Sequence, residues 1–476
     1  MSEKKPFYLT TTLPYVNADP HIGFALEIVQ ADIVARYNRL MGREVFFTTG
    51  TDEHGQKIFQ KAAEEGRDVQ EYVDHFAGRF NKLKEALKLS NDAFIRTTSV
   101  GHVAAAQELW KRCADAGDIY KKTYKGLYCV GDEAFLKESD LVNGKCPNHP
   151  NMELQEIEEE NYFFKLSKYQ AKLEEYLSKE GAIVPEWRRQ EALNFVRGGL
   201  EDFSISRVKD KMPWGILVPG DETQVMYVWF DALTNYISTL GWPDEGGNFK
   251  KFWAEGEVVQ VAGKDQVRFQ SIIWQAMLMS GGIKTTDKVV YHGFITSGGQ
   301  KMSKSLGNVI EPFALVDEYG TDTMRYVLAR VHSFEDSDMT VEKLKETYNA
   351  DLANGLGNLA ARIMQLAQTH LPEPVAVEFV PYPKEFTEAL DTFEIHKAAE
   401  YIWQRITALD QKITATAPFK VVKEDVEKGR AIIEGLVREL AAIDLMLEPI
   451  IPETSKKIID AIVANKKPEN LFPRKD

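Results

Sequence analysis

The stretch LPYVNADPHIGFALEIVQADI, residues 13–33, decides the fold class of this chain. The run FYLTTTL that leads into it, residues 7–13, is rich in aromatic and β-branched residues and predicts a strand. Turn formers then occupy positions 17, 19 and 20. Beyond them, apolar residues recur at spacings of three and four, which predicts a helix with one buried stripe made of Ile22, Leu26, Val29, Ile33, Tyr37 and Leu40.

A strand, a tight loop and a helix N-terminus together form a common phosphate site, because the free backbone amides and the helix dipole point at the ligand. His21 and Gly23 stand at this junction. The alternative is that the two residues only cap the helix, and the stretch by itself favours neither interpretation.

The residue pattern in the rest of the chain changes twice. From about Tyr120 to Val225 it is rich in turns, which indicates an insertion. Strand-like runs return in QVMYVWFDAL, EVVQVAGKD and KVVYHGFITS, as if the first sheet resumed, and beyond about Glu335 the pattern is that of amphipathic helices. This order predicts an α/β fold with a Rossmann-type parallel sheet, split by a small connective insertion and followed by an α-helical bundle.

Length and composition are those of an ordinary globular protein. With 476 residues the chain is too long for a single hydrophobic core, and about three or four domains are expected. No stretch has the apolar length of a signal peptide or a membrane span, so we expect a cytoplasmic protein with no membrane partner. Three cysteines, an odd number, do not suggest a secreted disulfide framework. The net charge of −14 argues against non-specific nucleic-acid binding and restricts any polyanionic partner to local basic sites.

Two common nucleotide-binding motifs, the P-loop and the GxGxxG dinucleotide fingerprint, do not occur. A glycine-flanked loop, GQKMSKSLGN at residues 299–308, instead carries Lys301 and Lys304 three positions apart. Two ammonium groups suit a developing polyphosphate charge, because a lysine is a point cation that needs no fixed fork geometry. As a charge pattern alone KxxK is usually a solvated turn, but the full pentamer KMSKS arises by chance with a probability on the order of 10⁻⁴.

The two signatures together, PHIG at residues 20–23 and KMSKS at residues 301–305, resemble those of class I aminoacyl-tRNA synthetases. Other segments resemble the methionyl-tRNA synthetase family in particular and follow its order along essentially the whole chain, among them TGTDEHGQK, YFFKLSKY, WGILVPGD, YVWFDALTNYI, GKDQVRFQSIIWQAMLM and DLANGLGNLAAR. The resemblance implies ATP-dependent activation of L-methionine to methionyl-adenylate, then transfer to tRNA(Met) with release of AMP and diphosphate. ATP would enter with Mg²⁺ as substrate.

The resemblance also implies roles for residues at the ATP site. His21 would contact the phosphates, while Lys301 and Lys304 would stabilise the departing pyrophosphate, and we expect these three to be catalytic. The other implied ATP contacts are Gly23, Glu27, Gly263, Asp265 and His292. For Glu27 the alternative is simple pairing with the helix dipole. The family signature ends in histidine where this chain has Phe24, so the remaining donors must carry more of the stabilisation.

The methionine pocket follows from chemistry as well as from the resemblance. The substrate ammonium group needs a buried anion, and Asp52 in TGTDEHG has that role by resemblance. The thioether favours aromatic and aliphatic walls, since sulfur interacts well with ring edges. The family positions for this pocket hold Leu13, Tyr15, Trp229, Ala232, Leu233, Tyr236 and Gln270. Gln270 replaces a frequent family histidine and cannot titrate near neutral pH, and without the resemblance Trp229 and Tyr236 would be core residues.

The insertion holds a candidate metal site. Cys129 with Asp132, and Cys146 with His149, form two pairs with knuckle spacing and offer four ligands for one structural Zn²⁺. Such knuckles occur in the resembled family, which usually has cysteine where this chain has Asp132, and a carboxylate is a less thiophilic ligand. The alternative is a vestigial site with two packed thiols.

The C-terminal helices carry a candidate tRNA interface. Asn354, Asn358 and Arg362 are spaced four apart and share one helix face, from which they could read unpaired bases. The resemblance implies that they read the CAU anticodon, and that Phe419 stacks on a base where the family commonly has tryptophan. Taken by itself, this helix face is more often an interhelical hydrogen-bond face.

We expect five segments: residues 1–117 and 226–290 as the two halves of the Rossmann catalytic domain, 118–225 as the connective insertion, 291–340 as the KMSKS stem-contact segment and 341–476 as the anticodon-binding domain. Synthetases for leucine, isoleucine and valine share the signatures, but their resemblance implies a large editing domain that the insertion is too short to hold. The other alternative is a non-catalytic tRNA-binding paralogue, supported only by Phe24. We expect a monomer.

Overall fold

A computed structural model describes residues 4–131, 134–136, 138–302, 310–377 and 380–475. The chain divides into two compact units. Unit 1 consists of residues 1–20, 38–84 and 90–292, and unit 2 of residues 21–37, 85–89 and 293–476.

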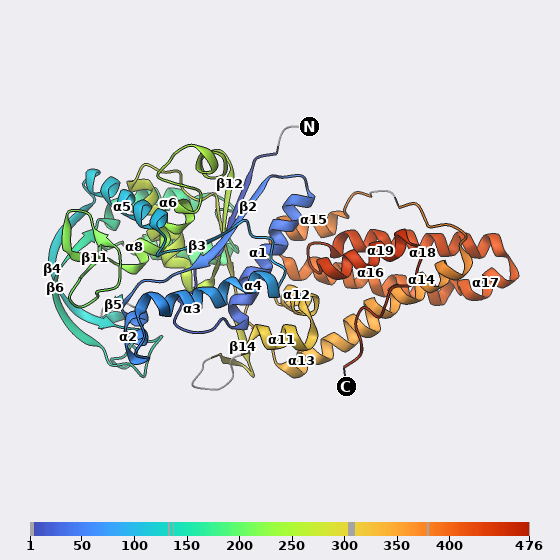
Figure 1. Ribbon diagram of the computed structural model, residues 1–476. Helices are drawn as coiled ribbons and strands as arrows, with labels where there is room; N and C mark the ends of the chain where they lie inside the picture. Colours follow the sequence, from blue (N-terminus) through green and yellow to red (C-terminus); the bar gives the residue numbers. More distant parts are fainter. Residues whose placement is uncertain (1–3, 132–133, 137, 303–309, 378–379, 476) are drawn as a thin grey trace. The chain divides into compact units, whose positions relative to one another are not determined.

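A six-stranded parallel sheet forms the centre of unit 1 (Figure 1). The strand order is β3 (Ala93–Arg96), β2 (Val45–Thr51), β1 (Phe7–Thr10), β12 (Glu257–Gly263), β13 (Lys288–His292) and β7 (Ile183–Val184). All four residues of β1 are buried, and because successive side chains point to opposite faces, both faces of the sheet are covered at this strand. The α/β fold class expected from the sequence is confirmed.

The strand order reverses between β1 and β12. From β1 the chain continues outward through β2 and β3, while the strands that return after residue 250 extend the sheet on the other side. In open parallel sheets such a switch point leaves a crevice at the carboxyl ends of the strands, where ligands bind. We therefore expect the ligand site among the loops that follow β1, β2, β12 and β13.

Two parts of the sheet differ from the sequence expectation. The run QVMYVWFDAL does not resume the parallel sheet: β11 (Asp221–Met226) pairs antiparallel with β9 (Ser206–Val208) and β10 (Leu217–Val218), and the rest of the run forms helix α8 (Val228–Leu233). Tertiary contacts override the strand propensity of this run. Its strand ends at Met226, and Tyr227, with an extended backbone, is the N-cap of α8. The edge strand β7 comes from within residues 118–225, where turn-rich composition concealed it.

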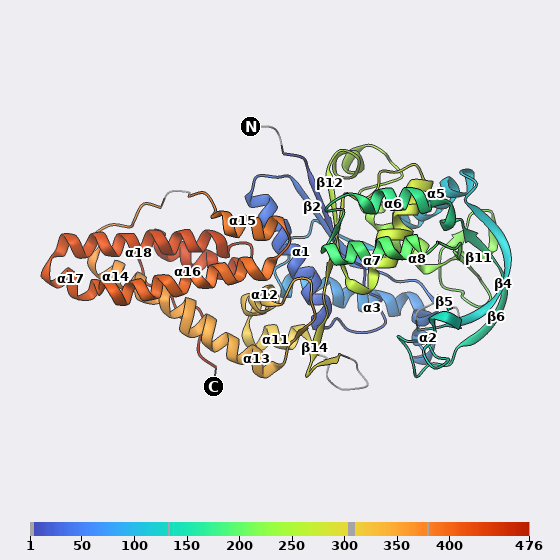
Figure 2. The same ribbon diagram turned by 180° about the vertical axis from the view of Figure 1, so that it is seen from behind.

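Residues 119–204 also build a four-stranded antiparallel sheet in unit 1. Its long pair, β4 (Ile119–Cys129) and β6 (Gln155–Phe164), runs in register from Ile119 opposite Phe164 to Tyr128 opposite Gln155. The two strands lie side by side in both views (Figures 1 and 2). The sheet is completed by β5 (Ala134–Leu136) and β8 (Phe203–Ser204).

Aromatic residues fill the core of unit 1. Tyr8 of β1 and Trp274, the first residue of α10 (Trp274–Ser280), both pack edge-on against Trp253, with ring centroids 6.0 and 6.2 Å from that of Trp253. The crossover helices around this core are α2 (Gln56–Glu64), α3 (Val69–Asn81), α5 (Val100–Asp115), α6 (Gln170–Ser178), α7 (Glu186–Arg197), α8, α9 (Asn235–Ser238) and α10 (Trp274–Ser280).

Unit 2 is mainly helical, as the sequence pattern predicted. The helices α14, α16, α18 and α19 pack side by side as a bundle (Figures 1 and 2). The helices of this unit are most of α1 (Ile22–Leu40), α11 (Pro312–Tyr319), α12 (Thr321–Arg330), α13 (Val341–Thr347), α14 (Asn358–His370), α15 (Lys384–Asp391), α16 (Ile395–Thr416), α17 (Pro418–Glu424), α18 (Val426–Leu447) and α19 (Pro452–Val463), while α4 (Leu83–Ala86) crosses the unit boundary. Short strands β14 (Ile295–Ser297), β15 (Gln300–Lys301) and β16 (Ser337–Asp338) form a small sheet.

Helix α1 contradicts the expectation of a single buried stripe. Every residue from Ala25 to Ala35 is buried, so the helix is enclosed on all sides. Its buried charge is compensated, because Asp32 Oδ2 lies 2.8 Å from Arg325 Nη1, and both side chains are fully buried. Arg325 also donates to the carbonyls of Pro449 and Ile450. A paired carboxylate is thus buried at a position outside the apolar stripe named from the sequence.

Candidate active site

The carboxyl ends of the parallel strands gather chemically active residues of unit 1 at one edge of the sheet. Tyr15 follows β1 and Asp52 follows β2, on one side of the switch point. On the other side, Gly263 ends β12 and His292 ends β13, and these two residues are paired in register. Four of the residues named from the sequence therefore share this edge.

Asp52 is held in place by the chain that follows β1. Its backbone N–H donates to the carbonyl of Pro14 at 3.0 Å, and its carbonyl accepts from the N–H of Val16 at 3.2 Å. The two bonds form an isolated parallel bridge between Tyr15 and Asp52. The Asp52 side chain is 4% exposed, so the structure places a buried carboxylate beside a tyrosine.

The proposed wall of the methionine pocket lies on α8 and α9. Trp229 stacks on Phe269, with ring centroids 3.8 Å apart and planes inclined by 14°. Phe269 directly precedes Gln270, so this stack joins α8 to the segment that carries the glutamine. Tyr236 is buried, and its carbonyl accepts from the Tyr8 hydroxyl at 2.7 Å. Sequence reasoning missed Phe269, although its position next to Gln270 was a signal. Of the remaining pocket residues, Ala232 and Leu233 are buried and Leu13 is half-buried.

Two buried donors in this region have no hydrogen-bond partner among the described residues: Trp229 Nε1 and Gln270 Nε2. Gln270 is only 1% exposed. Buried donors without partners are rare, and they mark places where water or a ligand accepts the bond. The two nitrogens therefore support a polar contact with a bound molecule at this edge of the sheet.

The remaining unit 1 residues named for ATP differ in exposure. His292 is buried at 5% exposed. Asp265 is exposed on the single turn Lys264–Gln266 that follows β12, and its carboxylate accepts from Gln266 Nε2 at 2.9 Å. A backbone glycine, an exposed carboxylate and a buried imidazole thus follow two adjacent strand ends.

In unit 2, His21 does cap helix α1. Its Nδ1 accepts from the backbone N–H of Gly23 at 3.1 Å. A Cβ at Gly23 would lie 2.9 Å from the imidazole Cε1, so a side chain there would displace the ring. Because Nδ1 accepts, the proton of the neutral ring is on Nε2, which can donate. The cap and the phosphate interpretation are therefore compatible: one nitrogen caps the helix and the other is a donor.

The lysine loop follows a tight hairpin. Gly298 and Gly299 have φ angles of 62° and 73°, the left-handed conformation that two-residue hairpin turns require. The hairpin pairs Lys301 with Thr296, and Gly299 N–H donates to Asp338 at 2.8 Å. Lys304 lies outside the described residues. Glu27, the remaining ATP candidate, is buried within α1.

The candidate anticodon residues lie along one helical segment of unit 2. Asn354 and Asn358 are exposed, on residues 348–370. Arg362 forms an ion pair with Asp410 of the neighbouring helix α16. Phe419 is 45% exposed, in the first turn of α17. Two amides and one ring are thus accessible, while the arginine is engaged in an interhelical contact.

Two buried charge clusters next to Asp52 were not anticipated. Glu53 is fully buried and accepts from Arg96 Nε and Nη2 at 2.7 and 2.8 Å. His54 Nδ1 lies 2.7 Å from Asp231 Oδ2, and His102 Nε2 lies 2.7 Å from Asp231 Oδ1. The signals were available, since TGTDEHG places three ionisable residues after a strand and Asp231 interrupts the apolar run YVWFDAL.

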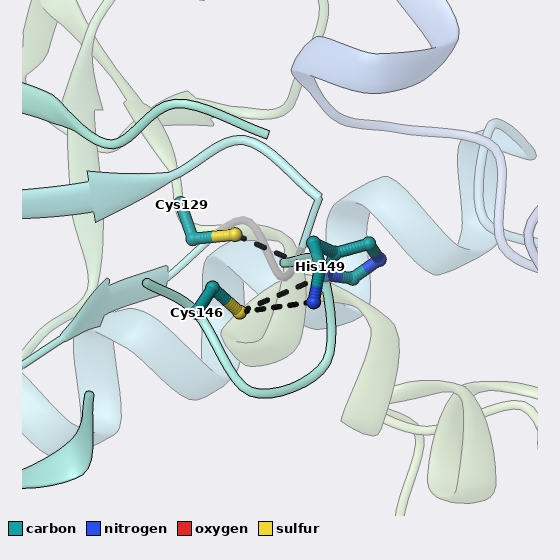
Figure 3. Close-up of side chains that lie close together, drawn as sticks. All are labelled: Cys129, Cys146 and His149. Atoms are coloured by element: carbon teal, nitrogen blue, oxygen red, sulfur yellow. Dashed lines mark hydrogen bonds between the residues drawn. The ribbon is translucent and has the colours of Figure 1, made fainter. Parts of the chain in front are cut away.

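Three of the four predicted metal ligands come together (Figure 3). Cys129 ends β4, and Cys146 and His149 lie in the loop before β6. Each cysteine Sγ is 3.9 Å from His149 Nδ1, and the three ligand atoms lie within 4.8 Å of one another. Ligands of a tetrahedral zinc ion with ordinary bond lengths are about 3.6 Å apart, so the set fits the metal. Asp132 lies outside the described residues.

Local backbone structure explains this cluster. Val142 and Lys145 exchange two backbone hydrogen bonds across Asn143 and Gly144, whose φ angles are 53° and 74°. Asn-Gly is the preferred sequence for such a turn. His149 N–H donates to Cys146 Sγ at 3.3 Å, which stabilises a thiolate. An added Cβ at residue 131 would lie 2.4 Å from the His149 ring, so only glycine leaves room for it.

Among the residues that the structure describes, no helix combines the length and apolar character needed to cross a bilayer.

Comparison with known proteins agrees with this geometry. A family model described as tRNA synthetases class I (M) matches residues 7–156 and 151–364. The methionine–tRNA ligase of Thermotoga maritima is 41% identical, over 97% of this chain and 76% of its own length. The corresponding ligase of Rhizobium meliloti is 39% identical, over 97% of this chain and 92% of its own length.

Solved structures are similar over nearly the whole chain. Mycobacterium tuberculosis methionyl-tRNA synthetase in complex with methionyl-adenylate superimposes with a TM-score of 0.90 at 36% identity, covering 99% of this chain and 100% of that one. The apo form of the same enzyme gives 0.83 at 32% identity, with 99% of both chains covered. On both sequence and structure, this chain belongs to the methionine–tRNA ligase family of class I tRNA synthetases.

Proposed function

We propose that this protein activates L-methionine with ATP to form methionyl-adenylate and then transfers the methionyl group to tRNA(Met), releasing AMP and diphosphate. The observation that carries the proposal is the likeness, at a TM-score of 0.90 over 99% of the chain, to a synthetase bound to methionyl-adenylate. The buried carboxylate and aromatic stack at the sheet's switch point support it independently.

The pocket chemistry suits methionine. We assign Asp52 as the anion for the substrate ammonium group, and a backbone bridge joins it to Tyr15 of the proposed pocket. The wall formed by Trp229 and Tyr236 accepts the thioether, because sulfur packs well on aromatic rings. Gln270 Nε2 is available to a polar group of the substrate.

The residues assigned to ATP act by stabilising negative charge and not by forming covalent bonds. Attack of the methionine carboxylate on the α-phosphorus expels pyrophosphate, so the reaction needs donors where negative charge develops. We assign this role to His21 through Nε2–H, to His292, and to Lys301 and Lys304. Gly23, Glu27, Gly263 and Asp265 complete the proposed ATP contacts. Mg²⁺ accompanies ATP as part of the substrate.

We assign anticodon binding to Asn354, Asn358, Arg362 and Phe419. The exposed amides offer donors and acceptors to unpaired base edges, and the exposed ring offers a stacking surface. Arg362 would have to exchange its partner Asp410 for a base or a phosphate.

We propose that Cys129, Cys146 and His149, with Asp132 as a fourth ligand, hold one structural Zn²⁺. The ion would crosslink the end of β4 to the loop before β6. Metal analysis of the purified protein is expected to find about one equivalent of zinc, and Cys146→Ser is expected to remove most of it. Cys113→Ser is the matched control, because Cys113 is also a buried free thiol but lies in α5 outside the cluster. Less than half an equivalent in the unmodified protein would contradict the zinc assignment.

Methionine-dependent ATP–pyrophosphate exchange is the experiment that tests the activity. We expect exchange with methionine and background rates with leucine, isoleucine and valine. Exchange with another amino acid would assign the chain to a different class I synthetase. Absence of exchange, with tRNA(Met) binding retained, would instead support the non-catalytic paralogue.

We also infer that the protein works in the cytoplasm, where tRNA charging serves translation. All three cysteines are free and buried, which is compatible with a reducing compartment. The monomeric state expected from the sequence stays a prediction that sedimentation analysis can check.

A further inference from the structure

Asp231 is the centre of a buried polar cluster that the reaction as proposed does not use. It lies on α8 between Trp229 and Leu233 in sequence, and its side chain is fully buried. A helix advances 100° per residue, so Asp231 faces away from the side that carries Trp229 and Leu233. The cluster therefore lies behind the proposed methionine wall.

Two other elements of unit 1 contact this carboxylate, and a third, α9, is joined to it through His102. His54, two residues after Asp52, places Nδ1 2.7 Å from Asp231 Oδ2. His102 of α5 places Nε2 2.7 Å from Asp231 Oδ1 and Nδ1 2.9 Å from Ser238 Oγ, at the end of α9. Both carboxylate oxygens are thus bound, each by a different histidine.

Proton positions follow from these contacts. Burial acts to raise the Asp231 pKa, but the charge of His54 and the hydrogen bonds of His102 and His54 outweigh it, so the pKa lies below its usual range. With Asp231 ionised, His54 Nδ1–H and His102 Nε2–H both donate to it. At its other ring nitrogen, Nδ1, His102 is hydrogen-bonded to Ser238 Oγ, which also donates to the Asn235 carbonyl at 3.4 Å. Every hydrogen bond of the cluster is directional, which fixes the orientation of each ring.

The cluster joins the two parts of the methionine pocket. His54 belongs to the same loop as Asp52, which would bind the substrate ammonium group. Asp231 and Ser238 belong to α8 and α9, which carry the aromatic wall. A buried ionic cluster is weak as a source of stability, because well-packed apolar residues of similar volume are often as stable. The effect of the cluster is on geometry, since its hydrogen bonds hold the loop of Asp52 at one distance from α8 and α9.

On the basis of the function proposed above, we propose that His54, Asp231 and His102 are positioning residues for methionine. They hold Asp52 at a fixed distance from the wall of Trp229 and Tyr236. None of the three need touch the substrate, and their effect is on methionine affinity rather than on ATP binding.

The sharpest test compares two substitutions of His54. In His54→Asn the amide nitrogen takes the place of Nδ1 and can still donate to Asp231, whereas His54→Leu removes the donor at similar volume. Methionine binding is measured without ATP or tRNA from the change in tryptophan fluorescence, because Trp229 belongs to the proposed pocket. Exchange kinetics then give separate KM values for methionine and ATP.

We expect His54→Leu to raise the Kd and KM for methionine about 10-fold or more, since small displacements of binding groups have large effects. His54→Asn is expected to stay within about 3-fold of the unmodified protein, and KM for ATP is expected to change less than about 2-fold in both. The same selective loss is expected for Asp231→Asn, which cannot accept from both histidines.

Asp118→Asn is the matched control for general destabilisation. Asp118 is also fully buried in unit 1 and accepts from Ser280 Oγ at 2.8 Å and from Tyr169, but it lies outside the loop of Asp52 and outside α8. If Asp118→Asn raises the methionine Kd as much as Asp231→Asn at equal loss of thermal stability, the cluster is merely structural and the proposal is overturned.

Other outcomes separate this inference from the proposed function. An active unmodified protein with equal methionine KM in His54→Leu and His54→Asn would refute only the positioning role. An unmodified protein without methionine-dependent exchange would refute the proposed function itself. Should His54→Leu not fold, the comparison of Asp231→Asn with Asp118→Asn decides the question by the same criteria.

Discussion

Replacing Phe419 by alanine should weaken tRNA binding without affecting methionine activation. The ring is 45% exposed in the first turn of α17, so one face can stack on a base. Stacking on an aromatic side chain contributes about 1–3 kcal/mol per base. Phenylalanine has a small ring, so we expect about 1–2 kcal/mol, which corresponds to an increase of about 5- to 30-fold in KM for tRNA(Met).

The assay separates the two half-reactions. Aminoacylation is measured over a range of tRNA concentrations, and ATP–pyrophosphate exchange is measured without tRNA. Phe195→Ala is the matched control, because this phenylalanine has a similar exposed fraction, 44%, and lies on α7 of unit 1, away from α17 in sequence. An unchanged KM for tRNA in Phe419→Ala, or an equal increase in Phe195→Ala, would refute the stacking assignment.

Three further predictions concern single residues. His21→Ala should slow ATP–pyrophosphate exchange about 100-fold or more, as expected for a lost charge-stabilising donor. Phe24→Ala should have little effect on adenylate formation. Equal, mild effects of the two substitutions would contradict the placement of the phosphate site at His21. Asp52→Asn should raise KM for methionine about 30-fold or more and leave KM for ATP nearly unchanged, because it removes one partner of a buried charge pair; a change confined to kcat would contradict this role. Burial raises the pKa of Asp444 to about 8. The folded state therefore retains a proton that the unfolded state loses at about pH 4, and the free energy of unfolding should fall as pH rises from about 4 to 8. Urea unfolding at pH 5 and pH 8 should show this loss diminished in Asp444→Asn, and an identical pH dependence in both proteins would contradict the assignment.

Part of the candidate site has a geometry that short stretches of sequence predict, because the contacts involved are local. PHIG and KMSKS are contiguous motifs, and the structure shows a local contact at each: the His21 cap with Gly23, and the double-glycine hairpin before Lys301. The candidate metal ligands Cys146 and His149 are also close in sequence, and the backbone N–H of His149 donates to Cys146 Sγ at 3.3 Å. Short-range geometry of this kind depends on backbone rules that a sequence displays directly.

The buried charges could not be located in this way. Asp32 lies outside the apolar stripe named from the sequence, and its burial is tolerated because two arginines pair with it: Arg36, four residues on, and Arg325, far away in sequence. Asp231 and His54 are 177 residues apart, and neither has a local signature of the contact between them. Charge pairs across such separations depend on which elements the fold brings together.

The sequence alone determined the fold class, the helical C-terminal unit and the identity of the signatures, because periodicity, turn residues and contiguous motifs are local properties. The tertiary structure decided that YVWFDAL is a helix, that β7 completes the parallel sheet, and that Asp52, Trp229 and the cluster around Asp231 belong to one unit. The physical reason is that burial and long-range pairing outweigh local propensities of about 1 kcal/mol or less per residue.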